Sequence, residues 1–154
     1  MSPAKRLDVE VDGMQETIRA FQGLEADLRR TANGELRQAA GQCASDLAGA
    51  LRSAAAASGV PVAPLVASSI RVKSDRLPSV SLGGPRKVGA TGAPAARLLW
   101  GSERGPAGDI NRFAVAPNPA GYWIRPTVTR FRSSEGIAAF KRAVYQLMRK
   151  WRLV

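Results

Sequence analysis

The chain of 154 residues contains no histidine, and cysteine occurs once, as Cys43. Imidazole performs most general acid–base catalysis at neutral pH, and a structural zinc site needs several thiolate or imidazole ligands. Carboxylate pairs remain as candidate acid–base groups, yet only four acidic residues follow position 60: Asp75, Glu103, Asp109 and Glu135. Cys43 lies on an apolar helical stripe, so we expect a small core residue there. These residue types favour a protein without a catalytic, metal or cofactor site.

One glycine-rich segment, GGPRKVGATG at 83–92, has the glycine spacing of a phosphate-binding loop. Ala90 stands where that loop needs a lysine to reach the phosphates, so we reject the nucleotide-binding interpretation. We expect a mobile loop over about 84–96 instead, because glycine and proline leave it few side chains for core contacts. Its cations, Arg86 and Lys87, are candidate contacts for a protein partner or for DNA.

Positive charge is concentrated in the second part of the chain. The net charge is +11, but residues 1–60 hold seven lysines and arginines against eight acidic residues, a balance of −1. Residues 61–154 hold sixteen against four, a balance of +12. Such a field favours polyanionic partners, either nucleic acid or acidic protein surfaces. The sequence shows no helix-turn-helix, zinc finger or RNA-recognition signature, so the case for nucleic acid rests on charge alone.

Three tryptophans, Trp100, Trp123 and Trp151, each lie on or beside an apolar stretch and close to an arginine. Stacking on nucleic-acid bases would require exposed rings interleaved with cations. A large aromatic residue on an apolar stripe more often belongs to the core, so we predict core positions for these three residues.

The N-terminal third predicts one strand followed by two helices. Apolar and acidic residues alternate over 7–11, which indicates a short strand with one buried face. Apolar residues at helical spacing predict helices over about 14–31 and 34–57, separated by Asn33 and Gly34.

Gly41 and Gly49 lie inside the second predicted helix, where each glycine costs about 1 kcal/mol relative to alanine. Close backbone approach would offset that cost. The approaching element is either part of the same chain, packed against the helix, or a neighbouring subunit.

Beyond position 60 the pattern indicates short strands and loops. Segments 66–75 and 77–83 have β-forming residues and predict an antiparallel hairpin that turns near Asp75 and Arg76. From Gly83 to Gly121, 13 of 39 residues are glycine or proline, which favours long loops. Within them, 97–101 is the clearest predicted strand and 112–116 a weaker one.

A basic amphipathic helix is predicted at the C-terminus. Pro126 suits the first turn of a helix, and Ser133, Ser134 and Gly136 predict a break into a shorter and a longer piece. An apolar stripe that includes Phe140 and Trp151 is expected to pack on the sheet. Arg142 and Arg149 lie on the opposite side and are further candidate contacts for a partner or DNA. The fold class is therefore α+β: one domain over 1–154, with a small antiparallel sheet packed by two N-terminal helices and one C-terminal helix.

The order of these elements resembles the tail-completion, or minor tail component, family found in the neck of long-tailed bacteriophages. The motifs that carry the resemblance are the strand end Val11-Asp12-Gly13, the proline-led strand Pro64 and Val66–Val72, the later strand end Trp100-Gly101-Ser102, and the helix opening Trp123-Ile124-Arg125-Pro126. The chain departs from the family pattern at Leu99, where an acidic residue is frequent, and over 94–97.

The resemblance implies a structural virion protein of the head-to-tail connector that forms a ring, commonly of six copies. Its expected partners are other copies of itself, the neighbouring neck and tail proteins (stopper, tail terminator or tail tube) and DNA in the channel. It implies assembly in the host cytoplasm and no catalysis. The longest apolar run, the alanines at 54–57, is far shorter than the roughly 20 residues that a membrane span needs, so we expect no such span. The alternative function, from charge alone, is a nucleic-acid-binding protein without sequence preference. A small enzyme is the third alternative.

Overall fold

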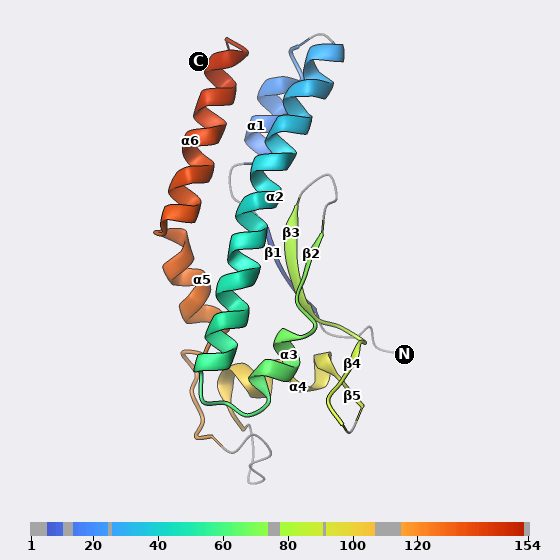
Figure 1. Cartoon of the computed structure of the whole chain (residues 1–154), viewed down its shortest axis with the longest axis vertical. Coiled ribbons are helices and arrows are strands. Elements are labelled where there is room, and N and C mark those ends of the chain that lie inside the picture. Colours follow the sequence, from blue (N-terminus) through green and yellow to red (C-terminus); the bar gives the residue numbers. More distant parts are fainter. Residues whose placement is uncertain are drawn as a thin grey trace.

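The computed structural model describes residues 6–10, 14–24, 26–73, 78–90, 92–106 and 115–152. These residues form an α+β fold with small antiparallel sheets, which confirms the predicted class (Figure 1). The helices are α1 (Met14–Phe21), α2 (Ala26–Ala57), α3 (Ala63–Ala67), α4 (Ala95–Arg104), α5 (Ile124–Arg132) and α6 (Glu135–Lys150). The strands are β1 (Arg6–Glu10), β2 (Arg71–Lys73), β3 (Ser79–Gly83), β4 (Lys87–Val88) and β5 (Ala93–Pro94).

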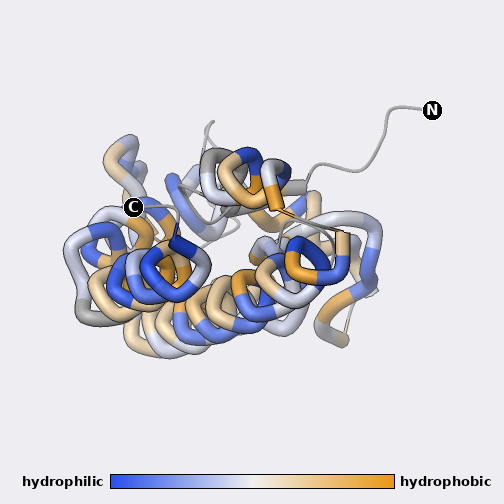
Figure 2. The backbone as a smooth tube through the Cα atoms, turned by 90° about the horizontal axis from the view of Figure 1, so that it is seen from above, coloured by the Kyte–Doolittle hydropathy of each residue, from blue (hydrophilic) through white to orange (hydrophobic). Residues whose placement is uncertain are grey.

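Helices α2 and α6 lie side by side along the long axis of the molecule, with α6 in its upper part in Figure 1. The helices α3 and α4 and the β4–β5 hairpin lie at the lower end (Figure 1). Hydrophobic and hydrophilic residues alternate along the helices when the molecule is viewed from above (Figure 2). The buried residues form two clusters. One joins the C-terminal half of α2, the lower half in Figure 1, to α3, α4 and β3. The other joins the N-terminal, upper half of α2 to α1 and α6.

The N-terminal helices are divided at a different place from the predicted one. The break falls between Phe21 and Ala26, where Gln22 N donates a hydrogen bond to Arg19 O and Leu24 N donates one to Phe21 O. Asn33 and Gly34, the predicted interruption, lie inside the 32-residue α2. Burial of Ala32 and Leu36 on either side of them keeps the helix continuous, since it outweighs the roughly 1 kcal/mol cost of a glycine.

The main sheet has the strand order β1-β3-β2, and all its pairs are antiparallel. The strand predicted over 7–11 is confirmed as β1, although Val11 lies outside the described residues. Val80 and Leu82 of β3 are fully buried, and Leu7 and Val72 pack against the same cluster. This face of the sheet therefore closes the core over α2.

Only part of the predicted hairpin is extended. Ser79–Gly83 pairs with Arg71–Lys73 as expected, but residues 63–67 form the helix α3. Pro64 is compatible with the first turn of a helix, and Val66 and Ala67 are buried on its inner side. The predicted turn at Asp75 and Arg76 lies outside the described residues.

Between 84 and 116 one predicted strand is a helix, and the predicted loop 84–96 contains a short hairpin; the mobility of that loop stays a prediction. Residues 97–101, predicted as a strand, lie inside the helix α4. Its buried residues Ala95, Leu99 and Ser102 follow helical spacing. In the predicted loop 84–96, β4 and β5 form a hairpin instead, and Val88 is buried. Of the predicted strand 112–116 only Val115 and Ala116 are described, and neither lies in a strand.

The C-terminal region breaks into α5 and α6, as predicted. Ser134 caps α6, because its side chain accepts a hydrogen bond from Ile137 N. The apolar stripe of α6 packs on α1 and α2, not on the sheet as predicted: Phe140 is buried with Phe21, Leu36 and Cys43. The sheet has already buried its apolar face against the lower half of α2, so the upper half is the surface left for α6.

Candidate functional site

Two sequence motifs meet at one buried carboxylate, that of Glu103. They are Trp100-Gly101-Ser102 in α4 and Trp123-Ile124-Arg125-Pro126 at the start of α5. Glu103 Oε1 accepts hydrogen bonds from Trp123 N at 2.9 Å and Ile124 N at 3.0 Å, and Glu103 Oε2 accepts one from Arg125 N at 2.7 Å. These amides begin α5, where backbone N–H groups lack helical partners and the helix dipole is positive. Glu103 is only 3% exposed, so it acts as a long-range cap inside the core.

Ser102 strengthens the same junction. Its hydroxyl donates to Leu99 O at 2.7 Å and accepts from the Trp123 indole Nε1 at 3.3 Å. The backbone of Glu103 adds a third link, because its carbonyl accepts from Tyr122 N at 2.7 Å. The last turn of α4 therefore fixes the start of α5.

Gly121 lets the chain pass close to this carboxylate. It has a φ of +97°, and a Cβ atom there would lie 2.9 Å from the Glu103 carboxylate. No side chain fits that position without displacing Glu103. Sequence reasoning counted Glu103 among the acidic residues but did not assign it this role. Its partners lie about 20 residues further along the chain, beyond the reach of local capping patterns.

The remaining residues of these elements have different environments. Gly101 is half-buried in α4, and its carbonyl accepts from Gly105 N at 2.9 Å. The Arg125 side chain is exposed. Pro126 is the third residue of α5, where a missing N–H costs little. These positions shape the junction rather than forming a reactive group.

The three tryptophans differ in exposure. Trp123 is 1% exposed, as predicted for a core residue. Trp151 is half-buried against the α1–α2–α6 cluster. Trp100 is 37% exposed, so its predicted core position was wrong: it follows Leu99 and faces away from the inner side of α4. The Arg104 guanidinium lies over the Trp100 ring, 5.0 Å from its centroid.

The four candidate contact cations are all exposed but do not form one surface. Arg86 and Lys87 lie at the β4–β5 hairpin, whereas Arg142 and Arg149 lie on α6. The hairpin and α6 lie towards opposite ends of the molecule (Figure 1). Arg149 lies over the Tyr145 ring, 5.9 Å from its centroid. The structure therefore offers two separate basic surfaces.

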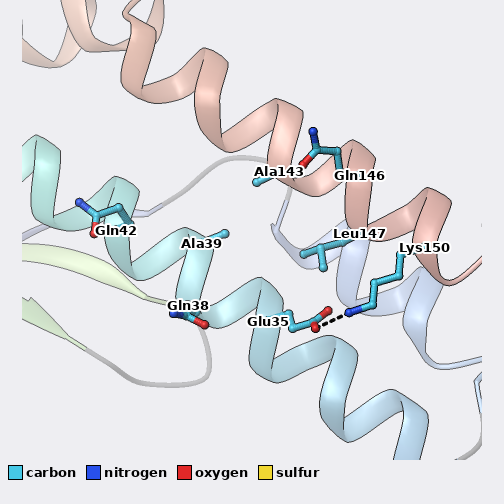
Figure 3. Close-up of a pocket in the computed structure, with 8 residues that line it drawn as sticks. All are labelled: Glu35, Gln38, Ala39, Gln42, Ala143, Gln146, Leu147 and Lys150. Carbon is cyan, nitrogen blue, oxygen red and sulfur yellow. Dashed lines mark hydrogen bonds and ion pairs between the residues drawn. The ribbon is translucent and has the colours of Figure 1, made fainter.

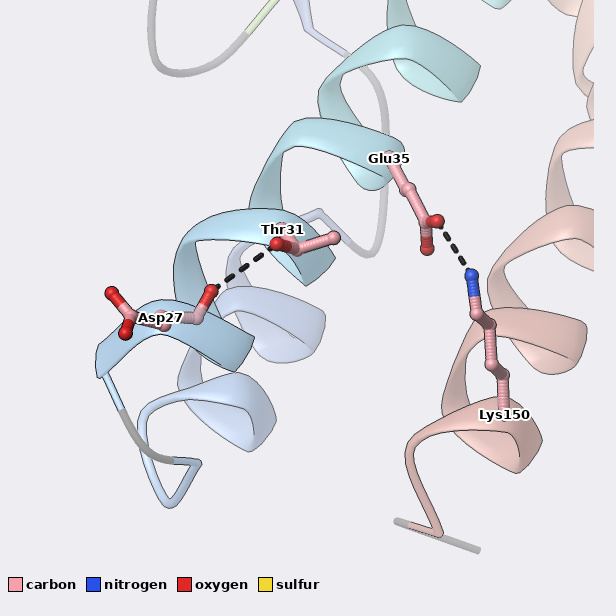
Figure 4. Close-up of polar contacts among 4 residues, drawn as sticks. All are labelled: Asp27, Thr31, Glu35 and Lys150. Carbon is pink, nitrogen blue, oxygen red and sulfur yellow. Dashed lines mark hydrogen bonds and ion pairs between the residues drawn. The ribbon is translucent and has the colours of Figure 1, made fainter.

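A groove lined by both polar and apolar side chains runs between α2 and α6 (Figure 3). Its volume is about 500 Å³, and Gln38 and Gln42 of α2 line it together with Gln146 of α6. At one end Lys150 Nζ pairs with Glu35 Oε1 at 2.6 Å, while Thr31 Oγ1, one turn earlier, donates to Asp27 O at 3.2 Å (Figure 4). Amides both donate and accept hydrogen bonds, so the groove suits polar recognition of a polypeptide.

Cys43 is buried in the α1–α2–α6 cluster, as predicted. Burial, with a smaller contribution from the negative charge of Asp46, raises the pKa of its thiol to about 11. The thiol is therefore protonated at neutral pH and is a poor nucleophile.

Among the residues that the structure describes, no group of three or more histidine, cysteine, aspartate or glutamate side chains is arranged to hold a metal ion. Within the same part of the chain, no helix has the length and apolar character needed to cross a membrane. Comparison with protein-family models, curated proteins and solved structures found no match.

Proposed function

We propose that this chain is a structural virion protein of the head-to-tail connector of a long-tailed bacteriophage. Several copies, six in the arrangement that the resemblance implies, would form a ring. The ring would complete the tail or join it to the capsid. One observation carries the proposal. The two elements Trp100-Gly101-Ser102 and Trp123-Ile124-Arg125-Pro126 are contiguous in space, through the bonds from Trp123 to Ser102 and Glu103. The two motifs pack as one structural unit, although Trp100-Gly101-Ser102 lies in the helix α4 where the family pattern has the end of a strand.

The mechanism is assembly, with charge and polar surface selecting the partners. Copies with a net charge of +11 repel one another at low ionic strength, so a stable ring requires acidic neighbours or counterions. The exposed cations Arg142 and Arg149 on α6, and Arg86 and Lys87 at the hairpin, give each copy two basic surfaces. Neighbouring copies and the adjoining neck and tail proteins are the proposed partners, and DNA in the channel is a further one.

The test is a double charge reversal on α6. Arg142→Glu with Arg149→Glu should leave the thermal unfolding temperature nearly unchanged, because exposed substitutions usually alter stability by less than about 0.5 kcal/mol. The yield of joined, infectious particles should fall at least about tenfold if this face contacts a partner. The matched control is Arg30→Glu with Arg37→Glu, which changes the charge equally on exposed positions of α2. Normal yield from the α6 double variant would contradict the assigned contact.

Sequence-independent binding to nucleic acid is the second candidate function, and the +12 balance of residues 61–154 favours it. In that case log Kd should rise with log salt concentration at a slope near 0.9 for each phosphate contacted. Titration of a DNA duplex at several salt concentrations distinguishes the two functions. A connector protein that contacts only proteins would show weak DNA affinity at physiological salt.

A further inference from the structure

The outer side of α4 carries an aromatic residue between two arginines. Arg97, Trp100 and Arg104 are separated by three and four residues, so they lie on one side of the helix, here called the α4 face. All three residues are exposed, whereas Leu99 is buried in the core. Stacking on nucleic-acid bases requires exposed rings interleaved with cations. Trp100 meets that requirement, and the buried Trp123 does not.

Trp100 and Arg104 are ordered against each other. The Arg104 guanidinium lies 5.0 Å from the centroid of the Trp100 ring. A guanidinium stacked on a ring keeps its N–H donors in its own plane, where they can bind a phosphate through two hydrogen bonds. Among the described residues, no other ring or cation lies against Trp100. The exposed part of the ring is therefore available to a base.

The described neighbours of the α4 face do not neutralise its positive charge. The elements with the most extensive contacts to α4 are α3, β3 and β5, and none of them contains an acidic residue. Segment 115–123, hydrogen-bonded to the C-terminal end of α4, contains none either. The acidic residue of α4 itself, Glu103, is buried, and its oxygens accept hydrogen bonds from α5. Neither Arg97 nor Arg104 forms an ion pair with another described residue.

The same spacing of arginines and an aromatic residue occurs in α6. Arg142, Tyr145 and Arg149 are also separated by three and four residues, and Arg149 lies over the exposed Tyr145 ring. Tryptophan, however, binds cations over its ring more strongly than tyrosine does. The α4 face therefore has the stronger combination of ring and charge, and α6 supplies a matched comparison.

The exposed ring distinguishes between the anions that two arginines could bind. A carboxylate of an acidic peptide offers no ring to Trp100, and the bases of a duplex are already stacked on one another. In a strand with unpaired bases, each base lies between two phosphates. A base stacked on Trp100 brings its flanking phosphates towards Arg97 and Arg104, whose backbone positions are about 10 Å apart along the helix. Charge and ring together favour single-stranded nucleic acid.

We infer that the α4 face binds single-stranded nucleic acid, with one base stacked on Trp100 and phosphates bound by Arg97 and Arg104. Binding is independent of sequence, because every base has a π face. The inference rests on nucleic-acid binding, the second candidate function, and adds to it the binding face and the form of the nucleic acid. It does not depend on a location in the neck of a phage.

The first experiment is an NMR titration of the ¹⁵N-labelled full chain. The probes are an oligothymidine of about twelve nucleotides and a DNA duplex of about twelve base pairs. Oligothymidine should shift the indole Nε1–H signal of Trp100 and the amides of residues 97–104, while the indole signal of Trp151 stays in place. The duplex should leave the Trp100 indole signal unshifted.

Substitutions of the two aromatic residues test the stack. Trp100→Leu should weaken oligothymidine binding at least about fivefold, the lower limit for the loss of one base stack, and Trp100→Tyr should restore most of it. Tyr145→Leu on α6 is the matched control and should change the affinity less than about twofold. An unshifted Trp123 indole signal shows that each variant is folded.

Salt dependence tests the arginines separately from the ring. Each phosphate contact of a single strand contributes about 0.7 to the slope of log Kd against log salt concentration. Arg97→Gln with Arg104→Gln should therefore lower the slope by about 1.4. Trp100→Leu, and Arg30→Gln with Arg37→Gln on exposed positions of α2, should each change the slope by less than about 0.3.

Several outcomes would overturn the inference. Unchanged oligothymidine affinity in Trp100→Leu, or equal losses in Trp100→Leu and Tyr145→Leu, would contradict the assigned face. Duplex binding as tight as strand binding and insensitive to Trp100→Leu would remove this inference while leaving nucleic-acid binding in place. Tighter binding of a polyglutamate peptide at these amides would assign the face to an acidic protein. The predicted oligothymidine results, from a chain absent from phage particles, would remove only the connector proposal.

Discussion

At the residue scale, Glu103 has the most consequential contacts in the second half of the chain. A buried carboxylate is costly unless its charge is compensated. Here the amides of Trp123, Ile124 and Arg125 supply that compensation at the positive end of α5. The acidic side chain thus has a structural task, which explains its position in the core without any catalytic role.

Glu103→Gln should lower the free energy of unfolding by about 2 to 4 kcal/mol, because the amide loses the charge and leaves at least one buried N–H without an acceptor. Urea unfolding followed by circular dichroism measures the change. Glu35→Gln is the matched control, since Glu35 forms a partly exposed pair with Lys150 and should cost less than about 1 kcal/mol. Equal losses in the two variants would contradict the capping role.

Gly121→Ala tests the same junction from the other side. The new Cβ would lie 2.9 Å from the Glu103 carboxylate at a φ of +97°, so unfolding should become easier by more than about 2 kcal/mol. Gly49→Ala in α2 is the opposite case, because a Cβ there meets no atom of the described residues within 4 Å. It should stabilise the isolated chain by up to about 1 kcal/mol. Thermal unfolding of both variants gives the comparison, and a tolerated Gly121→Ala would refute the geometry.

The lack of any contact at Gly41 and Gly49 also answers the question raised by the sequence. Among the residues that the structure describes, no atom lies within 4 Å of a Cβ at either position, so packing against this part of the chain does not account for these glycines. Contact with a neighbouring subunit stays a prediction.

At the element scale, the helix α6 is stabilised by another helix. Phe140 is 5% exposed and packs among residues of α1 and α2, so Phe140→Ala should cost about 3 to 5 kcal/mol. Tyr145, on the same helix, is 57% exposed, and Tyr145→Ala should cost less than about 1 kcal/mol. Chemical denaturation measures both. Similar costs would show that the inner face of α6 has been misidentified.

Local patterns predicted the elements whose periodicity is unambiguous. The strand β1, the end of α2 near Ala57 and the break between α5 and α6 follow from spacing and capping residues. Residues 97–101 were misassigned because a short apolar run fits a strand or a helix equally well, and only packing of Leu99 and Ser102 decides between them. The partner surface of α6 was also unpredictable, since an apolar stripe does not specify what covers it.

In the candidate site too, local patterns predicted some features, whereas tertiary packing decides others. Exposure of Arg142 and Arg149 was expected from their position opposite the apolar stripe of the last helix, and exposure of Arg86 and Lys87 was expected from their glycine-rich segment. Their separation into two surfaces depends on the relative placement of α6 and the hairpin, which no local pattern contains. The Glu103 junction likewise depends on the tertiary approach of α4 and α5.

At the scale of the whole molecule, the net charge determines how copies of the chain interact. The chain is elongated along α2 and α6 (Figure 1) and has basic residues at both ends. Self-repulsion between copies at +11 favours assembly onto acidic partners over free association. Under the proposed function, this repulsion would direct single copies onto a preformed capsid or tail.

The most direct test of the connector proposal is the location of the chain in tailed particles. Particles made from a genome that encodes this chain with a peptide tag would be purified, labelled with gold-conjugated antibody and imaged by electron microscopy, with untagged particles as the control. The proposal predicts label at the junction of head and tail. Particles that lack the chain, or label confined to the capsid shell or the tail tip, would contradict it.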